Sequence, residues 1–251
     1  MANAWDGGSA RVLAGLGFAA LATSSGASAA TLGRLDGAVT RDEALTHARA
    51  IAGATDLPVS ADLEKGFGDA PEVVAETIRQ ATAAGLVGGS IEDATGDPAH
   101  PIYDLGQATE RVAAAAAAAR ALPFPFMLTA RSENFLRGRP DLEDTIRRLQ
   151  AFERAGADVL FAPGLPDLAA VRTVCASVSK PVNFMVAIRG KSFSVAELAA
   201  AGVKRISLAM SLYRAAMAGL IEAAQEVREH GTFAYLGRAL PSARLNEFLK
   251  G

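Results

Sequence analysis

Residues 57–68 read LPVSADLEKGFG, and this stretch holds the pattern that decides the fold. Its apolar start predicts a buried strand over 57–62 that ends close to two carboxylates, Asp62 and Glu64. Two glycines follow, and then the segment 71–85, PEVVAETIRQATAAG, has the proline start and the alanine content of a helix. The stretch therefore predicts a strand with acidic residues at its carboxyl end that leads directly into a helix.

The same alternation of strand and helix runs along the whole chain. Short apolar or β-branched runs predict further strands at 18–24, 86–93, 124–131, 157–164, 180–186 and 203–209, with a very short one at 2–5. Amphipathic, alanine-rich segments predict helices between them, including 41–54, 141–156 and 211–230.

Apolar strands separated by helices favour a parallel sheet that is covered by helices. Eight such units in 251 residues have the size of an α/β fold of the (β/α)8 TIM-barrel type. The competing architecture is a doubly wound sheet, but no glycine-rich phosphate loop of the GxGxxG or GxxxxGK[ST] type follows a predicted strand. No long polar linker divides the chain, so we expect one barrel domain over residues 1–251.

Composition argues against several classes of protein. The chain has 25 basic and 27 acidic residues, a net charge of −2, and no basic patch interleaved with aromatic residues, so we expect no nucleic-acid partner. No apolar run approaches the roughly 20 residues of a membrane helix, and the first residues do not resemble a signal peptide. The single cysteine, Cys175, fits a packed thiol in a reducing compartment, and we therefore expect a cytoplasmic protein.

Carboxylates gather where the predicted strands end. Asp62 and Glu64 are two residues apart, which on a strand places both side chains on one face, and Glu92 ends the next predicted strand. Close carboxylates repel one another unless they are protonated or neutralised, and Mg²⁺ favours a few carboxylates plus waters. Each acid alone could instead cap a helix or pair with Lys65 or Arg131. Together they predict a magnesium site.

Other strand ends carry groups that suit an anionic substrate. Arg131 can bind a carboxylate or phosphonate in bidentate geometry, although an internal salt bridge to Glu92 or Glu133 explains it equally well. The turn Ser24-Ser25-Gly26 offers N–H groups and hydroxyls to an oxyanion, with simple helix capping as the alternative. Asn183 adds an amide on the predicted strand 180–186, and we expect it to contact the substrate.

These segments resemble the isocitrate lyase/phosphoenolpyruvate mutase superfamily. The matching stretches are NAWDGGSARVL, ALATSSGASAATLGRLDG, LPVSADLEKGFGD, GGSIEDAT, LTARSENF, AGADVLFAPG and KPVNFMV, in family order over nearly the whole chain. The resemblance implies a (β/α)8 barrel, usually a homotetramer whose last helices, here about 211–251, are exchanged between subunits. It also implies Mg²⁺ and small 2-oxo or 2-hydroxy carboxylate substrates, which react through a metal-stabilised enolate of a pyruvate-like unit.

The resemblance also assigns roles to individual residues. Asp62 matches the direct metal ligand, and Arg131 matches the substrate-binding arginine. The remaining matches are three acids that hold the metal largely through water and a turn that holds the substrate carboxylate and enolate oxygens: Asp36, Glu64 and Glu92, and Ser24, Ser25 and Gly26.

The sequence departs from the family pattern in three places. The paired acids usually read Asp-x-Asp, whereas the second one here is Glu64. The segment 94–106, ATGDPAHPIYDLG, lacks the catalytic cysteine loop of the lyase branch and does not match the loop of the mutase and hydrolase branches. His100 is its only strongly basic group and is a candidate acid-base residue for a closed loop, with a solvent-facing histidine as the alternative. Family members also commonly carry a further N-terminal helix, whereas this sequence starts almost at its first predicted strand.

Three functional readings follow. The first is an Mg²⁺-dependent lyase or decarboxylase-like enzyme that cleaves a C–C bond in a small 2-oxo- or 2-hydroxy-dicarboxylate. The second is a phosphoenolpyruvate mutase or phosphonopyruvate hydrolase, which acts on a P–C bond. The third is a non-catalytic member that binds a carboxylate ligand, and the joint presence of the acids and Arg131 counts against it. If the last helix is exchanged, we expect a neighbouring subunit to contact Tyr213, Met217, Leu220 and Ile221.

Overall fold

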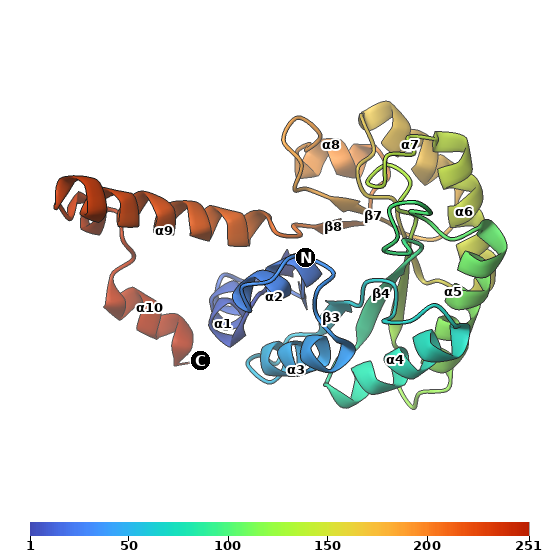
Figure 1. Ribbon diagram of the computed structural model, residues 1–251, viewed down its shortest axis with the longest axis horizontal. Helices are drawn as coiled ribbons and strands as arrows, with labels where there is room; N and C mark the ends of the chain where they lie inside the picture. The colour runs from blue at the N-terminus through green and yellow to red at the C-terminus, as the bar shows by residue number, and fades with distance from the viewer. Residues whose placement is uncertain (251) are drawn as a thin grey trace.

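The computed structural model describes residues 1–250 and shows eight parallel strands surrounded by helices (Figure 1). The strands are β1 Ala2–Asn3, β2 Leu21–Ala22, β3 Val59–Asp62, β4 Gly88–Glu92, β5 Met127–Arg131, β6 Val159–Phe161, β7 Val182–Met185 and β8 Arg205–Ser207. Each strand pairs with the next in chain order. The predicted (β/α)8 barrel is confirmed.

The helices follow the strands as the sequence pattern predicts. They are α1 Gly7–Gly15, α2 Ser25–Thr31, α3 Arg41–Ala52, α4 Pro71–Ala83, α5 Leu105–Arg120, α6 Leu142–Ala155, α7 Leu168–Ser177, α8 Val195–Ala200, α9 Ser211–His230 and α10 Ser242–Leu249, with a 3₁₀ turn η1 at Ala234–Gly237. Side chains that accept a bond from the first turn fix the starts of seven of them: Asp6, Ser24, Thr40, Asp104, Asp141, Asp167 and Ser194.

The strands are shorter than predicted, most clearly at β2, where the structure has Leu21–Ala22 in place of 18–24. Backbone pairing nevertheless continues past the end of β2, because the N–H of Thr23 donates to the Ser60 carbonyl at 2.9 Å. The Thr23 hydroxyl also accepts from the N–H of Asp62 at 3.0 Å. Backbone and side-chain bonds together therefore connect the carboxyl ends of β2 and β3.

The seam between β8 and β1 closes the barrel through a few bonds. The amino group of Met1 donates to the carbonyl of Ile206 at 2.7 Å. The side-chain oxygen of Asn3 accepts from the N–H of Leu208 at 3.0 Å and from the hydroxyl of Ser207 at 3.2 Å. Asn3 thus joins the first strand to the last.

The apolar core lies mainly between the strands and the helices, where Ile51, Ile78, Leu149 and Phe152 are fully buried. Cys175 packs half-buried in α7, which agrees with a structural thiol. Among residues 1–250, none of the helices combines the length and the apolar character that crossing a bilayer requires.

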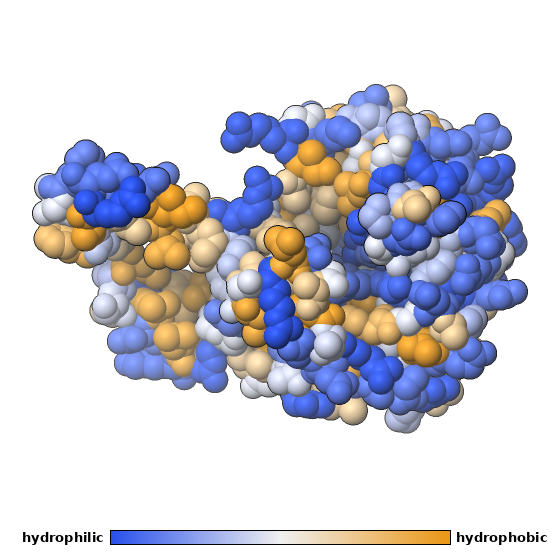
Figure 2. All heavy atoms as spheres, viewed as in Figure 1, coloured by the Kyte–Doolittle hydropathy of each residue, from blue (hydrophilic) through white to orange (hydrophobic). Residues whose placement is uncertain are grey.

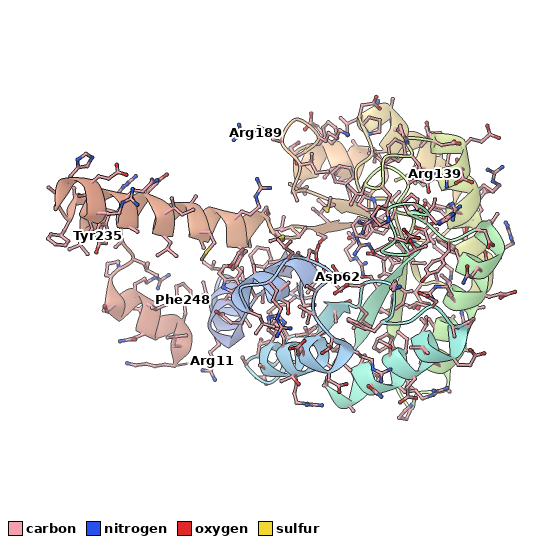
Figure 3. The ribbon with its side chains drawn as sticks, viewed as in Figure 1. Arg11, Asp62, Arg139, Arg189, Tyr235 and Phe248 are labelled. Carbon is pink, nitrogen blue, oxygen red and sulfur yellow. The ribbon has the colours of Figure 1, made fainter. Side chains whose placement is uncertain are left out.

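The C-terminal segment from α9 to α10, called the arm below, extends away from the barrel (Figure 1). None of the residues of α9 is buried, and Leu220 and Ile221 are 59% and 55% exposed. The arm turns back at its end, where α10 packs on α1 and Arg11 donates to the carbonyl of Leu249 at 2.6 Å. Phe248 lies beside α1 near Arg11, far from Asp62 inside the barrel (Figure 3).

Candidate active site

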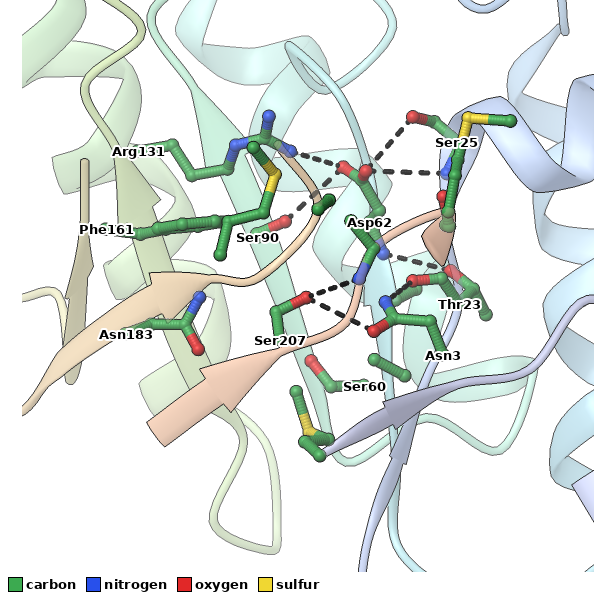
Figure 4. A pocket seen from close by; sticks show the side chains of 18 of the residues that line it. Asn3, Thr23, Ser25, Ser60, Asp62, Ser90, Arg131, Phe161, Asn183 and Ser207 are labelled. Atoms are coloured by element: carbon green, nitrogen blue, oxygen red, sulfur yellow. Dashed lines mark hydrogen bonds and ion pairs between the residues drawn. The ribbon is translucent and has the colours of Figure 1, made fainter. Parts of the chain in front are cut away.

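A cavity of about 260 Å³ opens at the carboxyl ends of the strands (Figure 4). Because the strands are parallel, their carboxyl ends meet at one end of the barrel, where the active sites of such barrels lie. The register places Asp62 beside Ser90 and Glu92 beside Arg131. Polar and apolar residues both line the cavity, and the polar ones include Asn3, Thr23, Ser24, Ser25, Asp36, Ser60, Asp62, Ser90, Arg131, Asn183, Arg205 and Ser207.

Asp62, the last residue of β3, is at the centre of the polar contacts. Its carboxylate accepts from Arg131 Nη1 at 2.9 Å, from the Ser25 hydroxyl at 3.0 Å and from the Ser25 N–H at 3.4 Å. Burial alone would raise the pKa of Asp62, but the Arg131 guanidinium and the Ser25 bonds outweigh it and hold the pKa below its ordinary value. Asp62 is therefore a charged oxygen donor that faces the cavity.

Arg131 is buried among three carboxylates. Its guanidinium lies 2.9 Å from Asp62, 3.0 Å from Glu92 and 2.8 Å from Glu133, and it stacks over the ring of Phe161. Burial would lower its pKa, but these acids raise it well above the usual value. The internal salt bridges expected as one alternative are therefore present, and the same guanidinium also lines the cavity.

Two acids near Asp62, Glu64 and Glu92, have raised pKa values. Burial raises the pKa of Glu92 to about 8, with Glu133 and Asp62 adding to the shift against Arg131. Burial also raises the pKa of Glu64 to about 7, with repulsion from Asp62 and Asp36 adding to it. Both acids line a second cavity of about 710 Å³ at the mouth, beside the first one. The acids of this cluster therefore outnumber the arginines that could balance their charge.

Glu64 lies in this cluster, but it is not part of strand β3, contrary to the prediction from strand alternation. Strand β3 ends at Asp62, and Glu64 follows in a turn with a left-handed φ of 49°, which is uncommon for a residue other than glycine. The expectation that both side chains lie on one face of a strand is therefore wrong. The turn directs Glu64 to the mouth, while Asp62 faces the inner cavity.

Asp36 and Gly26 meet at the mouth. Asp36 lies in the exposed loop between α2 and α3 and lines both cavities. A Cβ on Gly26 would come within 3.3 Å of the Asp36 carboxylate and 2.5 Å of the Met210 sulfur. Gly26 thus lets the start of α2 approach the Asp36 loop, although Gly26 itself does not line the cavities described here.

The oxygen donors suit Mg²⁺ better than a metal ion that protein side chains must coordinate completely. Among residues 1–250, no group of three His, Cys, Asp or Glu side chains forms a ready-made metal site. Mg²⁺ usually takes one or two carboxylates directly and keeps several waters. Asp62 has the chemistry of a direct ligand and lines the inner cavity, while Asp36, Glu64 and Glu92 line the adjoining cavity at the mouth. The raised pKa values of two of these acids agree with a place for a cation.

Not every predicted residue joins this cluster. Ser24 lines the inner cavity and also caps α2, since its hydroxyl accepts from the N–H of Ala27 at 3.4 Å. Asn183 lines the cavity as expected. His100 does not come near it: its side chain is 84% exposed, pairs with Asp97 at 3.3 Å, and lines neither of the two cavities described above.

Sequence reasoning missed several residues of the site, among them Ser90, Arg205 and Arg137. Ser90 precedes Glu92 by two positions on β4, and Arg205 lies on the predicted strand 203–209, so strand alternation was a usable signal for both. Arg137 donates to Glu92 at 3.1 Å from the turn after β5, which no period in the sequence predicts. Arg205 and Arg214 line the inner cavity beside Arg131, and Arg137 lines the cavity at the mouth.

The fold and the donor set agree with the comparison with known families. Residues 1–228 match the sequence model for phosphoenolpyruvate phosphomutase. The chain belongs to the phosphoenolpyruvate phosphomutase family. It is thus an enzyme of the isocitrate lyase/phosphoenolpyruvate mutase superfamily, as predicted, with the lyase and mutase chemistry of that group.

Relatives of the phosphomutase family extend over most of the chain. The 2-methylisocitrate lyase of Escherichia coli K12 is 30% identical over 226 residues, covering 86% of this chain and 75% of its own length. Among solved structures, a candidate lyase/mutase of Burkholderia cenocepacia J2315 is 52% identical with a TM-score of 0.98, covering 100% of this chain and 90% of the other. Oxaloacetate acetylhydrolase, solved with its product oxalate, is 27% identical with a TM-score of 0.88, covering 99% and 87%.

A fourth structure bears on the cofactor. Phosphonopyruvate hydrolase, solved with oxalate and Mg²⁺, shares the fold with a TM-score of 0.87 at 24% identity, covering 99% of this chain and 89% of its own. Mg²⁺ is therefore present in a protein of the same fold.

Proposed function

We propose that this chain is an Mg²⁺-dependent lyase or decarboxylase-like enzyme that cleaves a C–C bond in a small 2-oxo- or 2-hydroxy-dicarboxylate and releases a pyruvate-type product. The observation that carries the proposal is the Asp62 carboxylate, which lines the inner cavity together with Arg131 and Ser25. This arrangement places an oxygen donor for a cation, a guanidinium and hydrogen-bond donors around one small space.

The acids would hold the metal. Asp62 would bind Mg²⁺ directly, and Asp36, Glu64 and Glu92 would hold its water shell. When bound, Mg²⁺ would act as a Lewis acid on the oxygens of the substrate's 2-oxo acid.

The chain's own donors would hold the substrate and the charge that develops on it. Arg131 would bind the substrate carboxylate through its planar fork of N–H groups. The Ser24 and Ser25 hydroxyls and the Ser25 N–H, now directed in part at Asp62, would stabilise negative charge on oxygen as the bond breaks. Asn183 would contact the substrate from β7.

His100 in loop 94–106 is the candidate acid-base residue. His100 would take this role only if loop 94–106 moves, because its side chain is exposed and is held by Asp97 in this structure. The loop is folded on itself, since Ala94 pairs with Ile102 and Lys65 donates to the Thr95 carbonyl at 2.7 Å.

A second candidate is P–C bond chemistry, as in a phosphoenolpyruvate mutase or a phosphonopyruvate hydrolase. The match to the phosphomutase sequence model favours it, and the Arg131 guanidinium suits a phosphonate as well as a carboxylate. A non-catalytic carboxylate-binding member is the weakest candidate, because a binding protein has no need for the acids around Asp62.

The assembly we propose is a cytoplasmic homotetramer in which subunits exchange the arm. The absence of buried residues in α9 supports an exchange with a second copy of the chain. Tyr213 is partly covered by its own subunit, where it meets Trp5 edge to face at 5.6 Å. Leu220 and Ile221 are left for a neighbour.

The test is pyruvate release in a coupled assay, with and without Mg²⁺, on oxaloacetate, 2-methylisocitrate, a dialkylmalate and phosphonopyruvate. Phosphorus NMR of the phosphonopyruvate reaction is added, because a mutase would form phosphoenolpyruvate rather than pyruvate. Blanks without enzyme correct for the spontaneous decarboxylation of oxaloacetate. Mg²⁺-dependent turnover of one carbon acid would support the proposal and give its substrate class. Turnover of phosphonopyruvate alone would support the P–C alternative, and no turnover despite Mg²⁺ and oxalate binding would favour the non-catalytic one.

A further inference from the structure

A second arginine lies deeper in the inner cavity than Arg131. Arg205 begins β8 and points into the barrel, where its Nε donates to the Asn183 side-chain oxygen at 3.0 Å and its Nη2 to the Thr129 hydroxyl at 2.6 Å. A guanidinium carries five N–H donors. These two bonds leave three of them for other partners, and both bonded partners are neutral.

Arg205 differs from Arg131 in its charge environment. Arg131 contacts three carboxylates, whereas among residues 1–250 no carboxylate lies within ion-pair distance of Arg205. Burial lowers the pKa of Arg205 to about 10, so the group remains charged near neutral pH. Buried charges in proteins are usually paired, because an unpaired one is costly. A missing anion is therefore the simplest partner.

The cavity offers room for that anion at the right depth. Thr129 and Arg131 are two residues apart on β5 and face the same way, so Thr129 lies roughly 6.6 Å below Arg131 along the strand. The cavity that contains Arg131 and Asp62 continues to this level, where Ser60 and Ser207 add hydroxyls to its wall. One ligand in this cavity can thus contact both Arg131 and Arg205.

We propose that Arg205, oriented by Asn183 and Thr129, forms a second anion subsite that binds the remote carboxylate of a dicarboxylate substrate. This inference rests on the proposed function, in which the 2-oxo acid end of the substrate lies at Asp62 and Arg131. The separation of the two levels suits two carboxylates on a short carbon chain. Oxalate, whose carboxylates are bonded to each other, would occupy the upper level only.

Arg137 is the competing partner for a remote carboxylate. It lies at the mouth, is half exposed, and already pairs with Glu92 at 3.1 Å. A substrate that extends outward toward the loops would use Arg137, and one that extends inward would use Arg205. Because Arg205 has no acid partner and Arg137 has two, Glu92 and Glu133, the structure favours the inward direction.

Calorimetric titration in Mg²⁺ distinguishes the two directions. The probes are oxalate, pyruvate, which lacks a second carboxylate, and 3,3-difluorooxaloacetate, a dicarboxylate with no hydrogen on carbon 3 and therefore unable to enolise there. The variants are Arg205→Met and, as the matched control at the mouth, Arg137→Met. Loss of a charged hydrogen-bond partner weakens binding by roughly 10- to 100-fold. We expect that loss for difluorooxaloacetate in Arg205→Met, with oxalate and pyruvate binding within about twofold of wild type.

Each contrary result has its own meaning. Equal weakening of all three probes by Arg205→Met would make Arg205 a structural residue and overturn the inference. Selective weakening in Arg137→Met alone would overturn it in favour of the mouth. Absence of oxalate binding to the wild type would overturn the proposed function and this inference with it. Should Arg205→Met fail to fold, Arg205→Lys keeps the charge with a shorter reach, and a selective but smaller loss for difluorooxaloacetate would support the subsite.

Discussion

Around Arg131, three carboxylates oppose one buried guanidinium, and Arg137 from the half-exposed turn offsets them only in part. The pKa of Asp62 is lowered, because Arg131 and Ser25 stabilise its charged form against burial. The pKa values of Glu64 and Glu92 are raised, chiefly by burial. At the residue scale, the site thus combines one firmly charged oxygen donor with two acids whose ionised forms a cation would stabilise.

The first prediction concerns Asp62→Asn, which keeps the shape of the side chain and removes its charge. We expect Mg²⁺-dependent turnover to fall by at least about 10²-fold, since a single preorganised electrostatic group is commonly worth that much. We also expect the rise in melting temperature on adding Mg²⁺ and oxalate to disappear, because a ligand stabilises only the state that binds it. Ser90→Ala, which removes a hydroxyl 3.5 Å from the same carboxylate, is the control. A full Mg²⁺ shift in Asp62→Asn would make the metal assignment wrong.

The second prediction concerns pH. The folded-state pKa values of Glu64 and Glu92 are raised to about 7 and about 8, so the stability they contribute is fully present below their ordinary pKa and is lost as pH rises through these values. We expect the metal-free protein to melt at a lower temperature near pH 8.5 than near pH 6. Mg²⁺ favours the ionised acids, so its stabilising shift should be larger at the higher pH. Melting curves in EDTA and in Mg²⁺ measure both effects.

The control for the pH prediction is the double variant Glu64→Gln, Glu92→Gln, which should flatten the pH dependence between these two conditions. A metal-free wild type that becomes more stable as pH rises from 6 to 8.5 would contradict the raised pKa values.

The candidate site was predictable from the sequence where strand geometry fixes a side chain. Asp62 and Arg131 are the last residues of β3 and β5, so parallel pairing alone brings them to one end of the barrel. Glu64 lies in a left-handed turn, and His100 lies in a loop that folds on itself, so no periodicity fixes the position of either one. Arg205 was missed for another reason. It follows Lys204, and two consecutive basic residues at the start of a strand indicate a solvent-exposed strand end.

At the scale of elements, the turn that carries Glu64 is held by a neighbouring helix. Arg111 of α5 is only 1% exposed, stacks on the ring of Tyr103 at 4.2 Å, and donates to the backbone carbonyls of Lys65, Gly68 and Asp69. Burial lowers the pKa of Arg111, and the hydrogen bonds to these carbonyls offset part of the cost of burying it. The β3–α4 connection is therefore shaped by α5 as well as by its own sequence.

The third prediction is that Arg111→Met lowers the free energy of unfolding by about 2–4 kcal/mol, because it leaves three partly buried carbonyls without this donor. The Mg²⁺-induced shift should also shrink, since the turn that holds Glu64 loses its support. Urea unfolding at fixed pH measures the first effect and melting curves the second. Arg79→Met, at an exposed position of α4, is the matched control and should change stability by no more than about 0.5 kcal/mol. Equal losses in the two variants would contradict the role given to Arg111.

The sequence predicted the order of the elements better than their ends. Helix α6 matches its predicted range closely because Asp141 caps its start and Gly156, with a φ of 106°, ends it. Helix α2 was interpreted only as a turn, since SSGASAAT has no apolar period, although Ser24 caps its start. The close approach of Gly26 to Asp36 depends on the tertiary structure, which local sequence does not reveal.

For the whole molecule, the arm presents apolar surface that its own barrel does not cover. Figure 2 shows hydrophobic residues along the inner side of the arm. The large exposed apolar side chains of the arm are Leu220, Ile221, Val227, Phe233, Leu236, Leu240, Leu245 and Leu249. Helices in proteins gain most of their stability from packing an apolar face, and large exposed apolar patches mark interaction surfaces. A second copy of the same chain is the partner that the proposed exchange supplies.

The fourth prediction is therefore that the protein is a tetramer at micromolar concentration and that Leu220→Arg with Ile221→Arg shifts it to smaller species. Two buried charges at an apolar contact leave unpaired cations, which should separate the subunits and lower the melting temperature while the barrel keeps its far-ultraviolet circular dichroism. Sedimentation velocity over a range of concentrations measures the assembly. Glu229→Lys, on the same helix but among charged neighbours, is the control and should leave the tetramer intact.

Because exchange couples folding to association, the wild type should also melt at a temperature that rises with protein concentration. A wild type that sediments as a monomer would contradict the exchange of the arm between subunits.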